Sequence, residues 1–123
     1  MKKILLIDDD HLFLEFLTDY VREHYPKLEI IACDDPLKGL SLIEGDLDLL
    51  LLDLEMPKLD GCKLLAYAIE KGVDSKRIII LSGRDADYLH KRFAMGECLA
   101  VLNKTEARQK IVLDMIFAAL QKK

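Results

Sequence analysis

The sequence predicts an α/β fold in which five parallel strands form a doubly wound sheet with helices on both faces. Short, nearly continuous apolar runs recur along the chain and are typical of strands buried on both faces. They alternate with amphipathic stretches long enough to form helices. Repeated strand–helix units of this kind form parallel sheets. The length of 123 residues, 51% of them hydrophobic, fits one domain with a substantial core.

The expected elements alternate in order along the whole chain. The apolar runs predict strands over Lys3 to Asp8, Glu29 to Cys33, Leu47 to Asp53, Arg77 to Ser82 and Leu99 to Asn103. The stretches between and after them predict helices over Leu12 to His24, Pro36 to Glu44, Cys62 to Lys71, Ala86 to Met95 and Glu106 to Gln121. Asp35-Pro36 and Asp60-Gly61 are typical helix starts, and Gly72 is a typical helix end.

Composition narrows the classes of function. The formal charge of -4, with Lys and Arg scattered along the chain, argues against direct nucleic-acid binding. No apolar run reaches the ~18 residues that span a bilayer, and the N-terminus lacks a signal-peptide pattern, so we expect a cytoplasmic protein without membrane insertion. Cys33, Cys62 and Cys98 lack the paired spacing of a zinc site and are expected to be reduced thiols.

Four carboxylates follow two of the expected strands. Asp8, Asp9 and Asp10 come directly after the first apolar run, and Asp53 ends the third. The carboxyl ends of parallel strands meet at one edge of the sheet, where ligands bind. Carboxylates ~4 Å apart repel by about 1 kcal/mol even in water, so their convergence requires a cation or a proton. Oxygen ligands suit Mg²⁺ or Mn²⁺, whereas a helix cap would need only one of these acids.

Four motifs in one order carry a resemblance to a known family. They are Asp8-Asp9-Asp10, then Asp53-Leu54-Glu55-Met56-Pro57-Lys58-Leu59-Asp60-Gly61, then Ser82-Gly83, and finally Lys104. This series resembles the receiver domain of two-component response regulators, the CheY-like family of bacterial phosphorelays. The resemblance covers nearly the whole chain, so we expect one receiver domain over residues 1–123 without an output domain.

The resemblance also implies a role for each motif. Asp53 would accept a phosphoryl group from a phosphohistidine on a sensor histidine kinase or a histidine phosphotransfer protein. Ser82 and Lys104 would contact the phosphoryl oxygens. The implied metal ligands are Asp8, Asp9, Asp53 and the backbone carbonyl of Glu55. Such a domain assists only its own phosphorylation and dephosphorylation, so we do not expect an enzyme in the usual sense.

The segment before Lys104 departs from the family pattern. In the family a glycine commonly lies seven residues before the lysine and an aromatic residue three before it, but here Gly96 lies eight before and position 101 is Val. Strict counting from Gly96 would put Asn103 in place of the lysine; we favour Lys104. Because Val101 cannot swing as a ring does, we expect a smaller rearrangement of the fourth helix, fifth strand and fifth helix, or one carried by the backbone.

Some side chains outside these motifs lead to further expectations. Glu55 and Arg84 would flank the phosphoryl group and could pair across the mouth of the site; the alternative is that both are solvated surface charges. On the first helix, Leu12 and Leu14 are candidates for an exposed docking patch. The last helix, from Ile111 to Leu120, is apolar almost all round, which favours a homodimer through this face.

Functions of other classes remain as alternatives. One is a pseudo-receiver that binds partners without phosphorylation. The departure of the segment before Lys104 from the family pattern would suit it, although the intact acids argue against it. A magnesium-dependent phosphohydrolase for small molecules would share the Asp53 nucleophile, but its usual pair of aspartates is replaced by Asp53-Leu54-Glu55. A nucleotide or flavin site would need a glycine-rich phosphate loop after the first strand, and three acids stand there instead.

Overall fold

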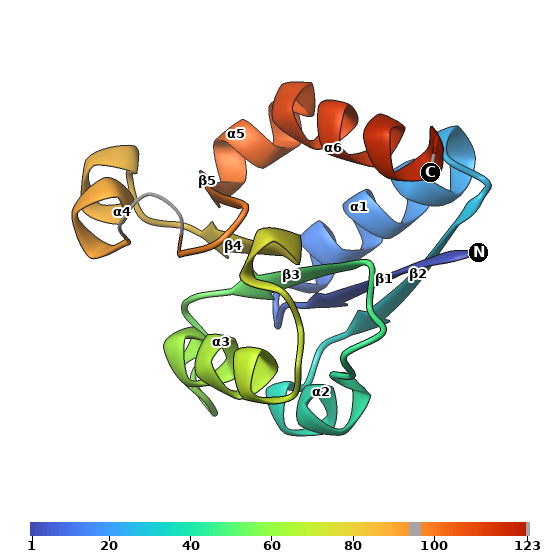
Figure 1. Cartoon of the computed structure of the whole chain (residues 1–123). Helices are drawn as coiled ribbons and strands as arrows, with labels where there is room; N and C mark the ends of the chain where they lie inside the picture. The colour runs from blue at the N-terminus through green and yellow to red at the C-terminus, as the bar shows by residue number, and fades with distance from the viewer. Residues whose placement is uncertain (94–96, 123) are drawn as a thin grey trace.

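A five-stranded parallel sheet forms the centre of the protein, which we describe from a computed structural model that defines residues 1–93 and 97–122. The strands are β1 (Lys2–Ile7), β2 (Leu28–Cys33), β3 (Leu49–Asp53), β4 (Ile78–Ser82) and β5 (Ala100–Asn103). They lie in the order β2-β1-β3-β4-β5, each parallel to its neighbours (Figure 1). The expected fold class is confirmed, and every strand begins and ends within two residues of its predicted bounds.

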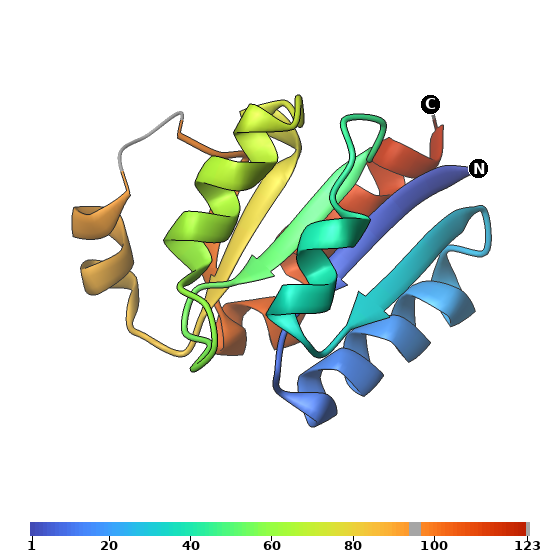
Figure 2. The same cartoon turned by 90° about the horizontal axis from the view of Figure 1, so that it is seen from below.

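Helices cover both faces of the sheet, as a doubly wound fold requires. They are α1 (His11–His24), α2 (Pro36–Leu42), α3 (Gly61–Glu70), α4 (Ala86–Arg92), α5 (Lys104–Gln109) and α6 (Ile111–Lys122), with a 3-10 turn η1 (Ser75–Arg77) before β4. In Figure 2, α2 and α3 lie in front of the sheet and α6 lies behind it. Helices α1, α5 and α6 share one core with the sheet, and α3 and α4 share the other.

The alternating side chains of each strand explain why two cores form. Ile4 and Leu6 of β1 point into the core shared with α1 and α6, whereas Leu5 and Ile7 point into the core shared with α3. All four are fully buried. Burying an aliphatic side chain contributes roughly 1.5–3 kcal/mol, so strands that are apolar on both faces hold the sheet rigidly between its helices. This rigid sheet fixes the positions of the residues that follow its strands.

The C-terminal helix differs from its expectation. We predicted one helix from Glu106 to Gln121, but the structure has α5 and α6 separated by Lys110, whose φ of 68° is left-handed. That conformation ends α5, although a glycine usually supplies it. Neither glycine nor proline marks the position, so periodicity alone could not reveal the break. The predicted helix Ala86 to Met95 ends at Arg92 in the structure, and its last two residues lie outside the described ones.

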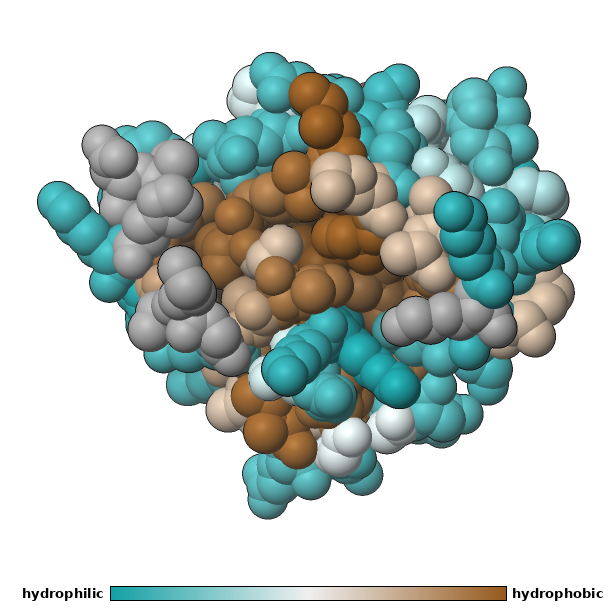
Figure 3. Space-filling view, turned by 45° about the horizontal axis from the view of Figure 1, so that its top comes forward, coloured by the Kyte–Doolittle hydropathy of each residue, from teal (hydrophilic) through white to brown (hydrophobic). Residues whose placement is uncertain are grey.

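Two predictions about apolar surfaces can be checked against burial. Leu12 is 74% exposed, as expected. Leu14, on the same helix, is buried, so the prediction that it belongs to an exposed patch was wrong. Ile111 and Met115 on α6 are exposed, as is Leu99 before β5. Figure 3 shows apolar surface on the side of the molecule that carries α5 and α6. In the part of the chain that the structure describes, no helix is long and apolar enough to cross a membrane.

Candidate functional site

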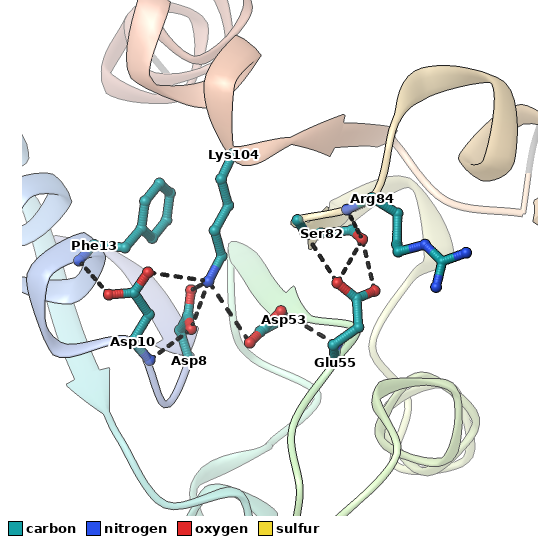
Figure 4. Close-up of polar contacts among 9 residues, drawn as sticks. Asp8, Asp10, Phe13, Asp53, Glu55, Ser82, Arg84 and Lys104 are labelled. Carbon is teal, nitrogen blue, oxygen red and sulfur yellow. Dashed lines mark hydrogen bonds and ion pairs between the residues drawn. The ribbon is translucent and has the colours of Figure 1, made fainter.

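The carboxyl edge of the sheet brings together the side chains that the sequence singled out (Figure 4). Asp8 and Asp9 follow β1, Asp53 ends β3, Ser82 ends β4, and Lys104 begins α5 directly after β5. The register of the strands explains this convergence, since Leu52, the residue before Asp53 in β3, pairs with both Ile7 and Ile80. Residues nearly a hundred positions apart therefore share one site.

Three carboxylates of the site are close enough to share one ion. Oxygen atoms of Asp8, Asp9 and Asp53 lie within 4.8 Å of one another. Asp8 is fully buried and Asp53 is 2% exposed, while Asp9 is partly exposed. Burial, and then the charge of Asp8, raise the pKa of Asp53 well above its ordinary value. The site thus holds its negative charges at an electrostatic cost.

Lys104 is the cation that faces these acids. Its Nζ donates a hydrogen bond to Asp8 Oδ1 at 3.0 Å and lies 2.9 Å from Asp8 Oδ2, 3.5 Å from Asp10 Oδ2 and 3.7 Å from Asp53 Oδ2. Burial acts to lower the Lys104 pKa, but the hydrogen bond and the charge of Asp8 outweigh it, and the pKa is raised. One ammonium therefore partly compensates several carboxylates and leaves an excess of negative charge.

The remaining donor set fits Mg²⁺. Asp8 Oδ2 is buried and completes no hydrogen bond, and the charge that faces it at 2.9 Å is the Lys104 ammonium, which it shares with Asp10 and Asp53. The cluster offers only carboxylate oxygens, which are hard ligands of the kind that Mg²⁺ takes in phosphate chemistry. A divalent cation would also relieve the repulsion between Asp8 and Asp53. Asp8, Asp9 and Asp53 are the residues that would hold it.

Asp10, the third acid after β1, has a structural role. Asp10 is the N-cap of α1, and its Oδ1 accepts a hydrogen bond from the Phe13 amide at 3.2 Å. That hydrogen bond, more than any other contact, lowers the Asp10 pKa. Its own amide donates to Asp8 Oδ1 at 2.9 Å, which orients the neighbouring carboxylate. The helix-cap interpretation therefore applies to Asp10, while Asp8 and Asp9 stay available as ligands.

Close packing at the end of β3 holds Asp53 in place. A Cβ atom on Gly61, the first residue of α3, would lie only 2.5 Å from the Asp53 carbonyl oxygen, so no larger residue fits there. Asp60 caps the same helix, its Oδ1 accepting from the Cys62 amide at 2.8 Å. The Glu55 amide donates to Asp53 Oδ1 at 3.3 Å. The Asp-Gly pair that suggested a helix start thus also fixes the backbone of the site.

Glu55 has different partners from the one we expected. Its carboxylate accepts hydrogen bonds from Ser82 Oγ, at 2.7 Å and 2.6 Å, and from the Gly83 amide at 2.9 Å. The guanidinium of Arg84 instead lies over the Tyr88 ring, 4.1 Å from its centre. The predicted Glu55–Arg84 ion pair is therefore wrong in this structure. The family resemblance implied that the two loops meet, but a backbone donor such as the Gly83 amide leaves no side-chain signal.

The structure also bears on the position of the lysine. Lys104 reaches the acids, whereas Asn103 completes the capping box of α5: its Oδ1 accepts from the Glu106 amide at 2.8 Å, and its own amide donates to Glu106 Oε1 at 3.4 Å. Asn103 is thus engaged away from the acids. Gly96, from which the register was counted, lies outside the described residues.

Comparison with known proteins gives a consistent result. A family model described as the response regulator receiver domain matches residues 4–115. The response regulator MprA of Mycobacterium ulcerans is 31% identical over 91% of this chain and 53% of its own length. The glycerol metabolism activator of Pseudomonas putida is 41% identical over 90% of this chain and 51% of its own. The chain spans about half the length of these curated relatives.

Solved structures show the same fold. The response regulator TrrA of Thermotoga maritima, in complex with Mg²⁺ and BeF, superposes with a TM-score of 0.78 at 25% identity, covering 98% of this chain and 99% of that one. The receiver domain of the Francisella response regulator 1452 gives a TM-score of 0.78 at 24% identity, covering 99% of this chain and 98% of that one.

Proposed function

The chain belongs to the response regulator receiver domain family, and from this premise we propose that it is a phosphorylation switch with Asp53 as the phosphoacceptor. Receiver domains are signalling domains rather than classical enzymes, they are phosphorylated, and they bind Mg²⁺ at an acidic pocket. One observation carries the proposal for this chain. The Asp53 carboxylate lies close to two further acids, Asp8 and Asp9, and 3.7 Å from the Lys104 ammonium.

The proposed reaction transfers a phosphoryl group to the Asp53 carboxylate. An Asp53 oxygen attacks phosphorus, the new P–O bond forms, and the P–N bond to the donor histidine breaks, with its electron pair returning to the imidazole. Phosphoryl transfer depends mainly on positioning and on cations around the developing charge. Lys104 supplies one such cation within 3.7 Å of Asp53. Mg²⁺ held by Asp8, Asp9, Asp53 and the Glu55 carbonyl would neutralise the acids and the incoming phosphoryl oxygens.

The implied partners follow from the family. Receiver domains interact with histidine kinases or histidine phosphotransfer proteins, and we propose a donor of this kind for this chain in the cytoplasm. We also propose that phosphorylation changes partner contacts or self-association through the surface of α4, β5 and the C-terminal helices α5 and α6. The exposed Ile111, Val112 and Met115 lie on this surface.

The experiment that tests this function is intact mass spectrometry after incubation with Mg²⁺ and acetyl phosphate. We expect the mass of one phosphoryl group on the wild-type protein and none on Asp53→Asn or in the presence of a chelator. Addition to Asp53→Asn at the wild-type level would contradict the assignment of Asp53. No addition, together with no Mg²⁺ binding by titration, would favour the pseudo-receiver; turnover of small phosphate esters would favour the phosphohydrolase.

A further inference from the structure

The carboxylate of Glu55 already occupies hydrogen-bond donors at the end of β4. Three contacts of 2.6–2.9 Å join its two oxygens to the hydroxyl of Ser82 and the amide of Gly83 (Figure 4). Hydrogen bonds to a charged carboxylate are stronger than those between neutral groups. The side chain therefore occupies these donors as an internal anion.

The Ser82 hydroxyl is committed to this contact. Ser82 is fully buried, and its Oγ accepts a hydrogen bond from the Arg84 amide at 2.9 Å. The hydroxyl proton must then go to another acceptor, and the Glu55 carboxylate is in place to take it. A second anion arriving at Ser82 would compete for the same proton. Replacement of Glu55 by the second anion would therefore keep the buried hydroxyl bonded.

We propose that Glu55 is an internal competitor of the phosphoryl group, a carboxylate that holds Ser82 and Gly83 in the unphosphorylated protein and leaves when Asp53 is modified. This inference rests on the proposed function, in which Ser82 contacts the phosphoryl oxygens. The two anions would belong to the same loop, since the backbone amide of Glu55 donates to Asp53 Oδ1. Their like charges add repulsion to the competition for donors.

The exchange would also link the site to α4. When Glu55 leaves, Ser82 and Gly83 take phosphoryl oxygens as acceptors, and the segment after β4 changes its partners through backbone and hydroxyl groups. Arg84 follows directly and lies over the ring of Tyr88 on α4. This link needs no aromatic residue on β5, where Val101 stands. A change of anion at Ser82 thus supplies the backbone-borne rearrangement expected from the sequence.

The first test needs neither metal nor phosphoryl mimic. We expect the Gly83 amide signal in the NMR spectrum to shift and its hydrogen exchange to accelerate in Glu55→Ala. The same change is expected in Glu55→Asp, which keeps the charge but is one methylene too short for these contacts. The control is Glu70→Ala, a change of equal charge at an exposed position on α3. An unmoved Gly83 signal in both Glu55 variants would overturn the contact.

The second test measures competition with beryllofluoride, a phosphoryl mimic, in the presence of Mg²⁺. We expect Glu55→Ala and Glu55→Asp to bind it about tenfold more tightly than the wild type, a difference of ~1.4 kcal/mol, while Glu70→Ala binds as the wild type does. If Glu55→Ala binds beryllofluoride more tightly but Glu55→Asp does not, the wild-type penalty comes from general charge repulsion. That result would overturn the proposed competition for Ser82 and Gly83. Equal or weaker binding by both variants would also overturn it.

The two tests separate this inference from the proposed function. If the wild type and all variants fail to bind beryllofluoride with Mg²⁺, the phosphorylation switch is overturned and the competition falls with it. The Gly83 signal would still decide whether the Glu55 contact exists. If the wild type binds and both Glu55 variants lose binding while remaining folded, Glu55 helps to build the site, and only the inference fails.

Discussion

Helix α1 has a polar cluster at each end, and the two clusters differ in how well their charges are matched. At its N-terminal end, the carboxylates of Asp8 and Asp53 share the single ammonium of Lys104. At its C-terminal end, Asp114 of α6 accepts hydrogen bonds from Tyr20 Oη at 2.6 Å and Tyr25 Oη at 2.8 Å, both to the same oxygen. One cluster has acids in excess, and the other gives one acid two neutral donors.

This difference leads us to expect that the first cluster takes a ligand and that the second contributes to stability. Neutral hydroxyls satisfy a carboxylate without bringing in further charge, so the Asp114 cluster gains nothing from a cation. Buried acids that outnumber their counter-charges remain under repulsion until a cation or proton arrives. We therefore expect Mg²⁺ to change the energetics at one end of α1 and to leave the other unchanged.

The largest expected effect is at Lys104. Lys104→Ala leaves the buried Asp8 carboxylate without its cation, which we expect to lower the free energy of unfolding by about 3 kcal/mol in a chelator. Mg²⁺ should restore most of this loss because it supplies the missing positive charge. Urea unfolding of each variant with chelator and with Mg²⁺ measures both quantities.

Two variants sharpen this prediction. Lys63→Ala removes an exposed lysine from α3 and should have little effect in either solution. Asp53→Asn removes one of the repelling acids, so it should stabilise the protein in chelator and reduce the gain from Mg²⁺. A loss in Lys104→Ala that is equal with and without Mg²⁺ would mean that the cluster does not take the cation.

A smaller effect is expected at the opposite end of α1. Asp114→Ala removes the carboxylate acceptor of both phenols and leaves Tyr25 Oη its longer contact of 3.4 Å with the carbonyl of residue 114, which should cost about 1–2 kcal/mol of unfolding free energy. The cost should be the same in chelator and in Mg²⁺, since no metal ligand is touched. The same unfolding series measures it. A cost that changed with Mg²⁺ would show that the two ends of α1 are coupled and would break the comparison.

The sequence predicted most of the strands and the meeting of the acids because the signals for both are local. Apolar runs fixed the strands, and the acids at Asp8, Asp9 and Asp53 could only meet at the carboxyl edge of a parallel sheet. The break at Lys110 left no such signal, because a left-handed conformation without glycine depends on tertiary contacts. There the Lys110 ammonium lies 4.6 Å from the centre of the Tyr20 ring.

Burial and hydrogen-bond partners were harder to predict than positions. Leu14 was expected to be exposed because the apolar residues of α1 outnumber one face, yet the sheet buries more than one stripe of that helix. For Glu55 we considered an ion pair with Arg84 or a solvated surface charge, yet it bonds to a hydroxyl and a backbone amide. Side-chain charge is visible in a sequence, but the direction of a backbone N–H group is set only by the folded loop.

The smallest expected effect is the pH dependence of the Asp114 cluster. The hydrogen bond to Asp114 raises the pKa of Tyr20 to about 12, and burial, with Asp114 second, raises that of Tyr25 to about 12. The folded protein therefore keeps these protons at a pH where the unfolded chain releases them. Their contribution to stability is fully present below pH 10, the ordinary value, and is lost as the pH rises towards 12. Solvent screening makes it small, because both rings are partly exposed.

Comparing the wild type with Asp114→Ala isolates this contribution from the other groups that titrate at high pH. The difference in unfolding free energy between the two proteins should be constant up to pH 10 and shrink above it, and tyrosinate absorbance should appear at lower pH in Asp114→Ala. Neither phenol contacts the acids of the site. Adding Mg²⁺ should therefore change neither the pH dependence of the free-energy difference nor that of the tyrosinate absorbance. A difference that grows with pH would have the opposite sign to the expected one, and it would mean that Asp114 does not hold the two phenols in their neutral form.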